Sequence, residues 1–315
     1  MSVTNDWVVY EPTAPNGKQI VLLAGDEEYR SEEALPQLAK ILAYRHGFKC
    51  TVLFSVNDKG EIDPDEHFNQ PGFKALDEAD LCVMLLRFRE WPDEQMKHFV
   101  DYYLAGKPIL ALRTSTHAFD NKKGEYERFG FRSKTWRGGF GKHVLGETWV
   151  SHWGNHGSQA TRGVPLLEQH AILQGVQNVF GTTDVYEAHP PVDAQVIMRG
   201  EVIEGMSVDD PSAEGKKKNA MGVEQELNDP MMPIVWYRDH TNEDGKTNRV
   251  MTTTMGAATD LTNEGLRRLL VNSVFWLLEM YVPQKANVEI VGDYDPSPFG
   301  FGGFKKGVKP SDLIK

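Results

Sequence analysis

Cysteine is scarce in this sequence, and the scarcity excludes two classes of protein. There are 2 cysteines in 315 residues, Cys50 and Cys82, and each lies within an apolar run. They lack the paired spacing of a structural zinc site or of a disulfide framework. We therefore expect two buried thiols that behave as small hydrophobic side chains.

Basic charge is also in short supply. The chain has 34 Lys and Arg against 45 Asp and Glu, a net charge of −11. Nucleic acids and anionic membranes both favour clustered positive charge. The one basic run, residues 216–218, lies in a polar stretch typical of a solvated loop. We expect no nucleic-acid partner and no membrane surface as a main partner.

Long apolar segments are absent as well. No stretch approaches the roughly 18 consecutive apolar residues that a membrane span requires. The beginning of the sequence, MSVTNDWVVYEP, has no basic start followed by an apolar segment. The chain as given is expected to be soluble, without membrane insertion, and cytoplasmic; export to the periplasm is the alternative if a signal peptide has been removed.

What the sequence does contain is an alternation of apolar and amphipathic segments. The predicted strands cover residues 19–24, 50–54, 81–86 and 109–112. Ser31 is expected to cap the first helix, and Pro92 to open the second. This alternation predicts an α/β fold with a mainly parallel sheet covered on both faces, in the flavodoxin-like strand order 2-1-3-4.

The rest of the chain is less regular. Shorter strands are predicted at residues 194–199, 234–238 and 249–254, and Thr262 or Asn263 is expected to cap a final helix. Residues 120–181 lack periodicity, and a segment of that length is usually functional or a lid. We expect one domain over residues 7–285. The Gly/Pro/aromatic tail, residues 286–315, then packs on this domain or on a partner subunit of a homo-oligomer.

Polar residues follow three of the predicted strands, at the edge of the sheet where ligands bind in open α/β folds. The substrate-binding candidates are Glu27, Tyr29, Arg30, Arg87, Arg89, Arg113, Ser115 and the more distant Trp153, and the catalytic candidates are Glu28, His117 and His152. One interpretation is an acid/base or anion-binding pocket. The other is a structural ion-pair cluster in which the arginines neutralise Glu27 and Glu28. We favour the pocket because the residues gather at the predicted ligand edge.

The motif HWGNHG places His152 and His156 four residues apart. This spacing lets two imidazoles bind one divalent metal ion, such as zinc. A third ligand would have to come from a distant residue, for which Glu28, His117 and His189 are the candidates. The alternative is that the histidines pack among aromatic side chains or bind substrate. Trp149 and Trp153 beside them suit either stacking on a sugar ring or a place in the core.

Five motifs together resemble the ThuA-like family, which is named for trehalose utilisation. They are GDEEYRSEEALP (residues 25–36), LRFREWPDEQ (86–95), LRTSTHAF (112–119), HWGNHG (152–157) and TTTMGAATDL (252–261). The resemblance extends over residues 7–312. It implies the class I glutamine amidotransferase-like fold, a flavodoxin-like three-layer sandwich.

The resemblance also implies a role in carbohydrate metabolism. An enzyme of this kind would act on glycosides or oxidised (keto) sugars, with or without a metal, and hydrolase, lyase and isomerase chemistry all stay open. The alternative is a non-catalytic sugar-binding or structural module that kept the fold.

Related amidotransferases carry a cysteine nucleophile on the turn after the strand that corresponds to residues 109–112, and a histidine after a late strand. Here the turn holds Arg113 and Thr114, and Met255 follows the late strand. Without a Cys–His pair we expect no glutamine amidotransferase activity. Ser115 and His117 are two residues apart, which does not establish a catalytic triad.

Overall fold

The computed structural model describes residues 6–167 and 169–314. Its central sheet contains β1 (Trp7–Tyr10), β2 (Gln19–Gly25), β3 (Lys49–Phe54), β4 (Leu81–Leu86), β5 (Ile109–Leu112), β7 (Thr161–Pro165), β8 (Phe180–Gly181), β10 (Gln195–Val202), β13 (Met232–Thr241) and β14 (Thr247–Thr253). The strand order in this 10-stranded sheet is β1-β3-β2-β4-β5-β14-β13-β10-β7-β8.

The middle of the sheet is parallel. Strands β3, β2, β4, β5 and β14 pair in parallel, and numbered along the chain they give the doubly wound order 2-1-3-4-5. The predicted α/β class and flavodoxin-like order are confirmed. As a result, the carboxyl ends of β2, β4 and β5 lie next to one another at one edge of the sheet.

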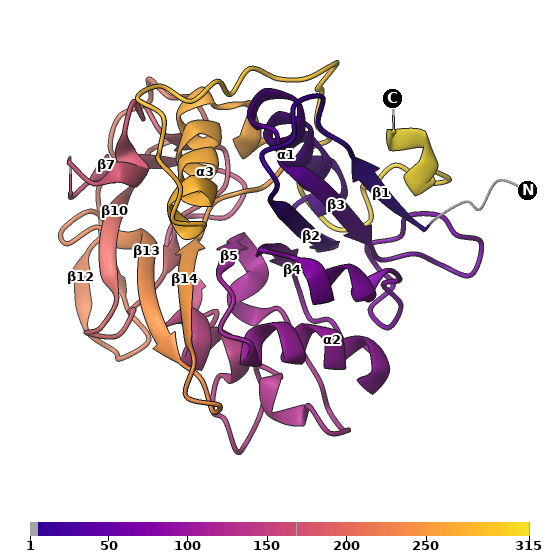
Figure 1. Ribbon diagram of the computed structural model, residues 1–315. Helices are drawn as coiled ribbons and strands as arrows, with labels where there is room; N and C mark the ends of the chain where they lie inside the picture. Colours follow the sequence, from indigo (N-terminus) through magenta and orange to yellow (C-terminus); the bar gives the residue numbers. More distant parts are fainter. Residues whose placement is uncertain (1–5, 168, 315) are drawn as a thin grey trace, which may run out of the picture.

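Antiparallel strands extend the sheet on both sides. Strands β13, β10, β7 and β8 follow β14, and β1 pairs with β3 at the opposite edge; the extension beyond β14 forms the salmon-coloured side of Figure 1. Strand β13 reaches β14 through a short turn at residues 242–246, and so tight a connection can join only antiparallel neighbours. The predicted later strands are present, and they make the sheet mixed.

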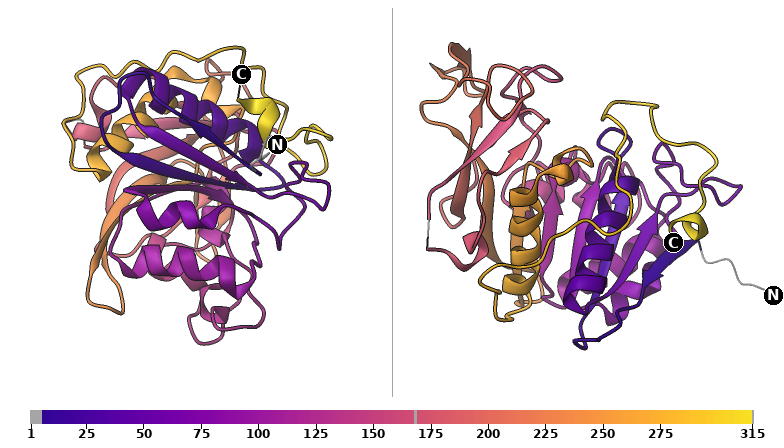
Figure 2. Two further views of the ribbon diagram at one scale, coloured as in Figure 1. Left: turned by 45° about the vertical axis from the view of Figure 1, so that its right-hand side comes forward. Right: turned by 90° about the horizontal axis from the view of Figure 1, so that it is seen from above.

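Helices cover both faces of the sheet. Helices α1 (Ser31–His46) and α3 (Glu264–Leu277) pack on one face and α2 (Asp93–Leu104) on the other, as the left view of Figure 2 shows. Side chains of β2 alternate accordingly: Leu22 joins the core under α1, and Leu23 the core under α2. No helix within the described ranges has the length and apolar content to cross a membrane.

Of the two side-chain caps predicted for α1 and α3, the one on α3 is confirmed. The Asn263 side chain accepts a hydrogen bond from the Leu266 amide at 2.8 Å and caps α3, as expected. The predicted cap at Ser31 is wrong. The N-cap of α1 is Arg30 in a left-handed conformation (φ 58°), and the Ser31 hydroxyl accepts instead from the Asp26 amide. The Ser31 hydroxyl is therefore bound to the preceding loop and is not available to cap the helix.

The C-terminal tail returns over the domain. In Figure 1 it is the yellow segment that passes beside α1 and ends near β1. The Ser297 amide donates to the Glu33 carboxylate at 2.8 Å, and the Tyr10 hydroxyl donates to the Leu313 carbonyl at 2.9 Å. Residue 315 of the predicted tail lies outside the described residues.

Beneath the tail, the first turn of α1 contains an unusual carboxylate. Glu32 is 9% exposed, and neither of its oxygens has a hydrogen-bond partner among the described residues. An unpaired buried charge is costly, so a buried carboxyl tends to keep its proton. Burial raises the pKa of Glu32 to about 8.

Replacing Glu32 by Gln is expected to stabilise the protein at neutral pH. The folded state holds this proton to about pH 8, whereas the unfolded chain releases it near 4.5, so the free energy of unfolding falls as pH rises between these values. At 1.36 kcal/mol per pKa unit, the loss reaches about 2 kcal/mol by pH 6. Urea unfolding from about pH 5 to pH 8 should show a flatter pH profile for Glu32→Gln. The exposed Glu289 provides the control, because Glu289→Gln should keep the wild-type slope.

Candidate functional site

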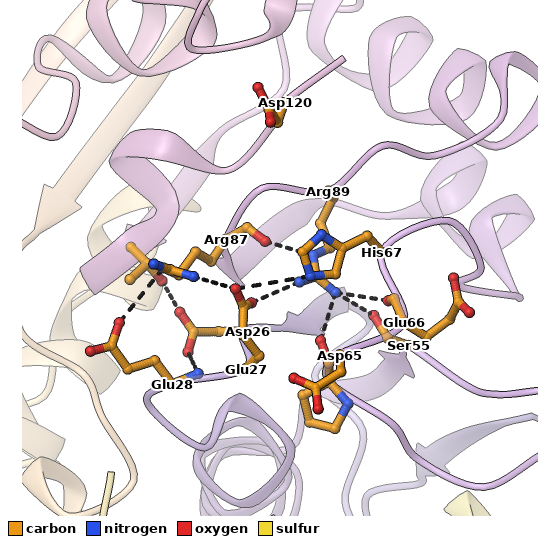
Figure 3. A network of polar contacts seen from close by, with 12 residues as sticks. Asp26, Glu27, Glu28, Ser55, Asp65, Glu66, His67, Arg87, Arg89 and Asp120 are labelled. Carbon is orange, nitrogen blue, oxygen red and sulfur yellow. Dashed lines mark hydrogen bonds and ion pairs between the residues drawn. The ribbon is translucent and has the colours of Figure 1, made fainter. Parts of the chain in front are cut away.

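One ion-pair network joins the loops that follow β2 and β4 (Figure 3). The Glu27 carboxylate accepts from Arg87 and, at 2.8 Å, from Arg89. Arg89 is fully buried, and its other hydrogen bonds go to the Ser55 hydroxyl and to the carbonyls of Pro64, Glu66 and Arg87. This guanidinium therefore holds loops together, which agrees with the structural interpretation for this part of the edge.

The side chains of three further substrate-binding candidates contact the protein itself and do not face solvent. The Ser115 hydroxyl donates to the Met84 carbonyl at 2.9 Å and so completes the backbone pairing at the end of β4. Trp153 is 1% exposed within the core. Arg30 is buried and donates to the carbonyls of Glu27 and Gly300. Sequence position alone could not show that these side chains turn inward.

Arg113 has a different partner from the one expected. It follows β5 with φ 42°, a left-handed conformation that is strained for a side chain of this size. Its guanidinium donates to the Asp184 carboxylate at 2.8 Å and to the Thr254 carbonyl at 2.7 Å. It also lies 3.7 Å from the centre of the Tyr186 ring. Arg113 and Asp184 thus form a fully buried ion pair.

The same carboxylate binds both histidines of HWGNHG. Nδ1 of His152 lies 2.8 Å from one Asp184 oxygen, and Nδ1 of His156 lies 3.1 Å from the other. Strand β6 (Ser151–His152) pairs with β9 (Tyr186–Glu187), and this pairing brings His152 beside Asp184. Each histidine side chain is 35% exposed. We call Arg113, Asp184, His152 and His156 the Asp184 cluster.

The electrostatics of the cluster distinguish its members. Burial favours a higher pKa for Asp184, but Arg113 and the hydrogen bonds from both imidazoles outweigh it and hold this pKa well below its usual range. The hydrogen bond to Asp184 raises the pKa of His156. Nε2 of His156 lies 3.4 Å from Glu28, whose own pKa is raised by burial. His156 therefore sits between two carboxylates, which favours its protonated form.

Other candidates surround the cluster. His117 is buried, and burial together with Arg87 and Arg113 lowers its pKa well below the usual value. The Trp149 ring lies 5.9 Å from His117 and 5.8 Å from His152. The tail contributes Phe299, 5.4 Å from the His156 ring and 5.6 Å from that of Tyr29. Aromatic side chains from three separate segments thus border the two exposed imidazoles.

The third potential metal ligand is one that the sequence did not suggest. Ligand atoms of His152, His156 and Asp184 all lie within 4.8 Å of one another. Of the three candidates for this position, His189 instead pairs with Glu187 at 2.8 Å. Asp184 does not stand at a spacing from HWGNHG that is typical of a metal site. The only sequence pattern around it is the polar run TTD before two apolar residues.

No protein-family model matches the sequence, and a search of curated proteins finds no match either. Solved structures do match. A ThuA-like protein from Parabacteroides merdae superposes with a TM-score of 0.52 at 15% sequence identity, over 84% of this chain and 92% of that one. The chain has the ThuA-like fold. A ThuA-like protein from Bacteroides uniformis gives a TM-score of 0.49 at 17% identity, with the same coverage.

Arg113 opens the turn that follows β5, where no nucleophilic cysteine is expected. Its amide donates to the Met255 carbonyl at 3.2 Å, so the turns after β5 and β14 meet through an arginine and backbone atoms. Both cysteines are fully buried within β3 and β4, and burial raises the pKa of each thiol. A buried neutral thiol is a poor nucleophile.

We therefore expect no release of ammonia from glutamine and no reaction of the native protein with iodoacetamide. Mass spectrometry should find Cys50 and Cys82 unmodified in the folded protein and both carbamidomethylated after unfolding in urea, which serves as the control. Glutaminase activity that disappears on alkylation of either thiol would contradict this expectation.

The ion pair at the centre of the cluster predicts a large stability effect. Asp184→Asn keeps the volume but removes the charged hydrogen-bond partner of the buried Arg113 guanidinium, so the free energy of unfolding should fall by about 3–5 kcal/mol. The matched control is Asp101→Asn, which breaks the solvent-exposed pair with Lys97 and should cost far less. Equal losses in urea denaturation would show that Arg113 does not depend on Asp184.

Proposed function

We propose that this chain is an enzyme of carbohydrate metabolism that acts on glycosides or oxidised (keto) sugars at the Asp184 cluster. The observation that carries the proposal is that one buried carboxylate, held by a buried arginine, orients two partly exposed imidazoles at the carboxyl edge of the sheet. The Arg113–Asp184 pair is already neutral without the histidines. Their presence at the surface supports a chemical role rather than a structural one.

The geometry favours proton transfer. An imidazole that donates Nδ1–H to an ionised carboxylate keeps a lone pair on Nε2 and can act as a general base. His152 fits this role, because its Nε2 has no partner in the part of the chain that the structure describes. His156, protonated between Asp184 and Glu28, fits the general acid. Such a pair can move protons at a glycosidic oxygen or at the carbon beside a keto group.

A metal-assisted version uses the same residues differently. His152 and His156 would each bind a zinc ion through one ring nitrogen, together with Asp184, since Arg113 occupies one oxygen of that carboxylate and leaves the other. A bound zinc ion would polarise a carbonyl group or activate water. The two versions exclude each other, because an imidazole nitrogen whose lone pair binds a metal can no longer take up a proton.

The surroundings suit a sugar. Pyranose rings have apolar C–H faces and polar edges, and ligand sites combine aromatic walls with a few placed polar groups. The partly exposed rings of Trp149 and Phe299 supply the aromatic surface, and Arg87 adds a guanidinium that is 19% exposed. Tyr29, a predicted substrate-binding residue, is fully buried beneath them. The resemblance to the ThuA-like family supports the same class of ligand.

His152→Gln tests the proposal. The loss of a general base should lower kcat/KM by roughly 10²–10⁴-fold on whichever member of a panel of disaccharides, keto-sugars and uronic acids the wild type converts. His189→Gln is the control, because this histidine lies near the cluster but pairs with Glu187, and it should retain activity. If the wild type binds a sugar and converts none of the panel, the protein is a non-catalytic sugar-binding module.

Metal content decides between the two versions of the chemistry. Elemental analysis of the purified protein should show no stoichiometric zinc if His152 and His156 transfer protons. One zinc ion per chain, lost in His156→Gln and retained in His189→Gln, would establish the metal-assisted version instead.

A further inference from the structure

A cavity of about 210 Å³ lies between α1 and the C-terminal tail. It is lined by Glu32, Glu33, Pro36, Gln37, Lys40, Ile62, Asp293, Tyr294, Asp295, Lys305, Val308 and Leu313. None of these residues belongs to the Asp184 cluster. This volume exceeds that of the roughly 150 Å³ engineered cavities that bind benzene, so a small organic molecule can be accommodated.

The cavity is acidic and only partly neutralised. Its lining contains four carboxylates and two lysines. One oxygen of Glu33 accepts from the Ser297 amide at 2.8 Å and lies 3.4 Å from the Lys305 amine. The other oxygen of Glu33 and both oxygens of Glu32 are buried and have no hydrogen-bond partner among the described residues. Three carboxylate oxygens of the lining are thus unpaired.

Buried carboxylates without partners either keep a proton or receive a cation. Among the described residues, three metal-ligating side chains converge at the Asp184 cluster and not in this cavity. Apolar side chains make up much of the remaining lining, including Pro36, Ile62, Val308 and Leu313. The lining therefore complements a molecule with one positive group and a small apolar body.

We propose that this cavity is a binding site for an organic amine, with the ammonium group against Glu32 and the apolar body against the side chains of α1 and the tail. The site is separate from the proposed sugar site, and its existence does not depend on it. Because the pKa of Glu32 is raised by burial, an arriving ammonium group displaces the carboxyl proton to solvent. Arg30, Glu33 and Asp26 are the charged neighbours that also act on Glu32.

Benzylamine, benzyl alcohol and benzoate are suitable probes because they share a ring and differ in charge. At about 10 mM and about pH 8, benzylamine should raise the Tm of the wild type by a few degrees, whereas benzoate should not. Benzyl alcohol should bind at least roughly tenfold more weakly than benzylamine by calorimetry. Calorimetry in buffers of different ionisation enthalpy should also detect release of a proton when benzylamine binds below pH 8.

Glu32→Gln supplies the decisive comparison. This variant keeps the shape of the cavity and should fold, but its affinity for benzylamine should fall at least roughly tenfold. Glu289→Gln, on the surface, should bind like the wild type. The proposal is overturned if benzylamine neither binds nor stabilises the wild type, if Glu32→Gln binds it equally well, or if benzyl alcohol binds as tightly as the amine.

Discussion

The buried ion pair between Arg113 and Asp184 is the interaction on which the candidate site depends. It joins the end of β5, in the parallel part of the sheet, to the segment just before β9, 71 residues away. Both side chains are fully buried, so neither is stable there without the other. The histidines then take their orientation from the carboxylate. The strained turn after β5 directs a guanidinium inward and fixes the position of an acid.

The sequence was most informative where a pattern has one physical explanation. Continuous apolar runs such as LCVMLL in β4 suit a strand buried on both faces, and their spacing with helices led directly to the parallel order. The gathering of Glu28, His152 and His156 is also consistent with the prediction. Asp184 was missed because its position depends on the pairing of two-residue strands, β6 and β9, and strands that short leave no periodic signal. Likewise, only the three-dimensional contacts distinguish the partly exposed Arg87 from the fully buried Arg89.

Two carboxylates of one short segment illustrate how differently a fold can treat buried charge. Glu27 receives two guanidiniums, and Glu32, five residues later, receives no hydrogen bond from the described chain. Both are almost inaccessible to water. At Glu27 the fold supplies the counter-charges that burial requires, and the resulting ion pairs join the loops after β2 and β4. At Glu32 the fold supplies no counter-charge, and the carboxyl keeps its proton at neutral pH instead.

The return of the tail has a consequence for how the protein is made. The Gly300 amide donates to the Glu28 carbonyl at 2.7 Å, and the Tyr10 hydroxyl binds the Leu313 carbonyl, so these contacts join parts of the chain separated by about 270 to 300 residues. During synthesis the parallel sheet and the Asp184 cluster can form while residues 296–313 are still in the ribosome. A nascent chain therefore passes through a state in which the histidines lack Phe299 and the first turn of α1 is uncovered.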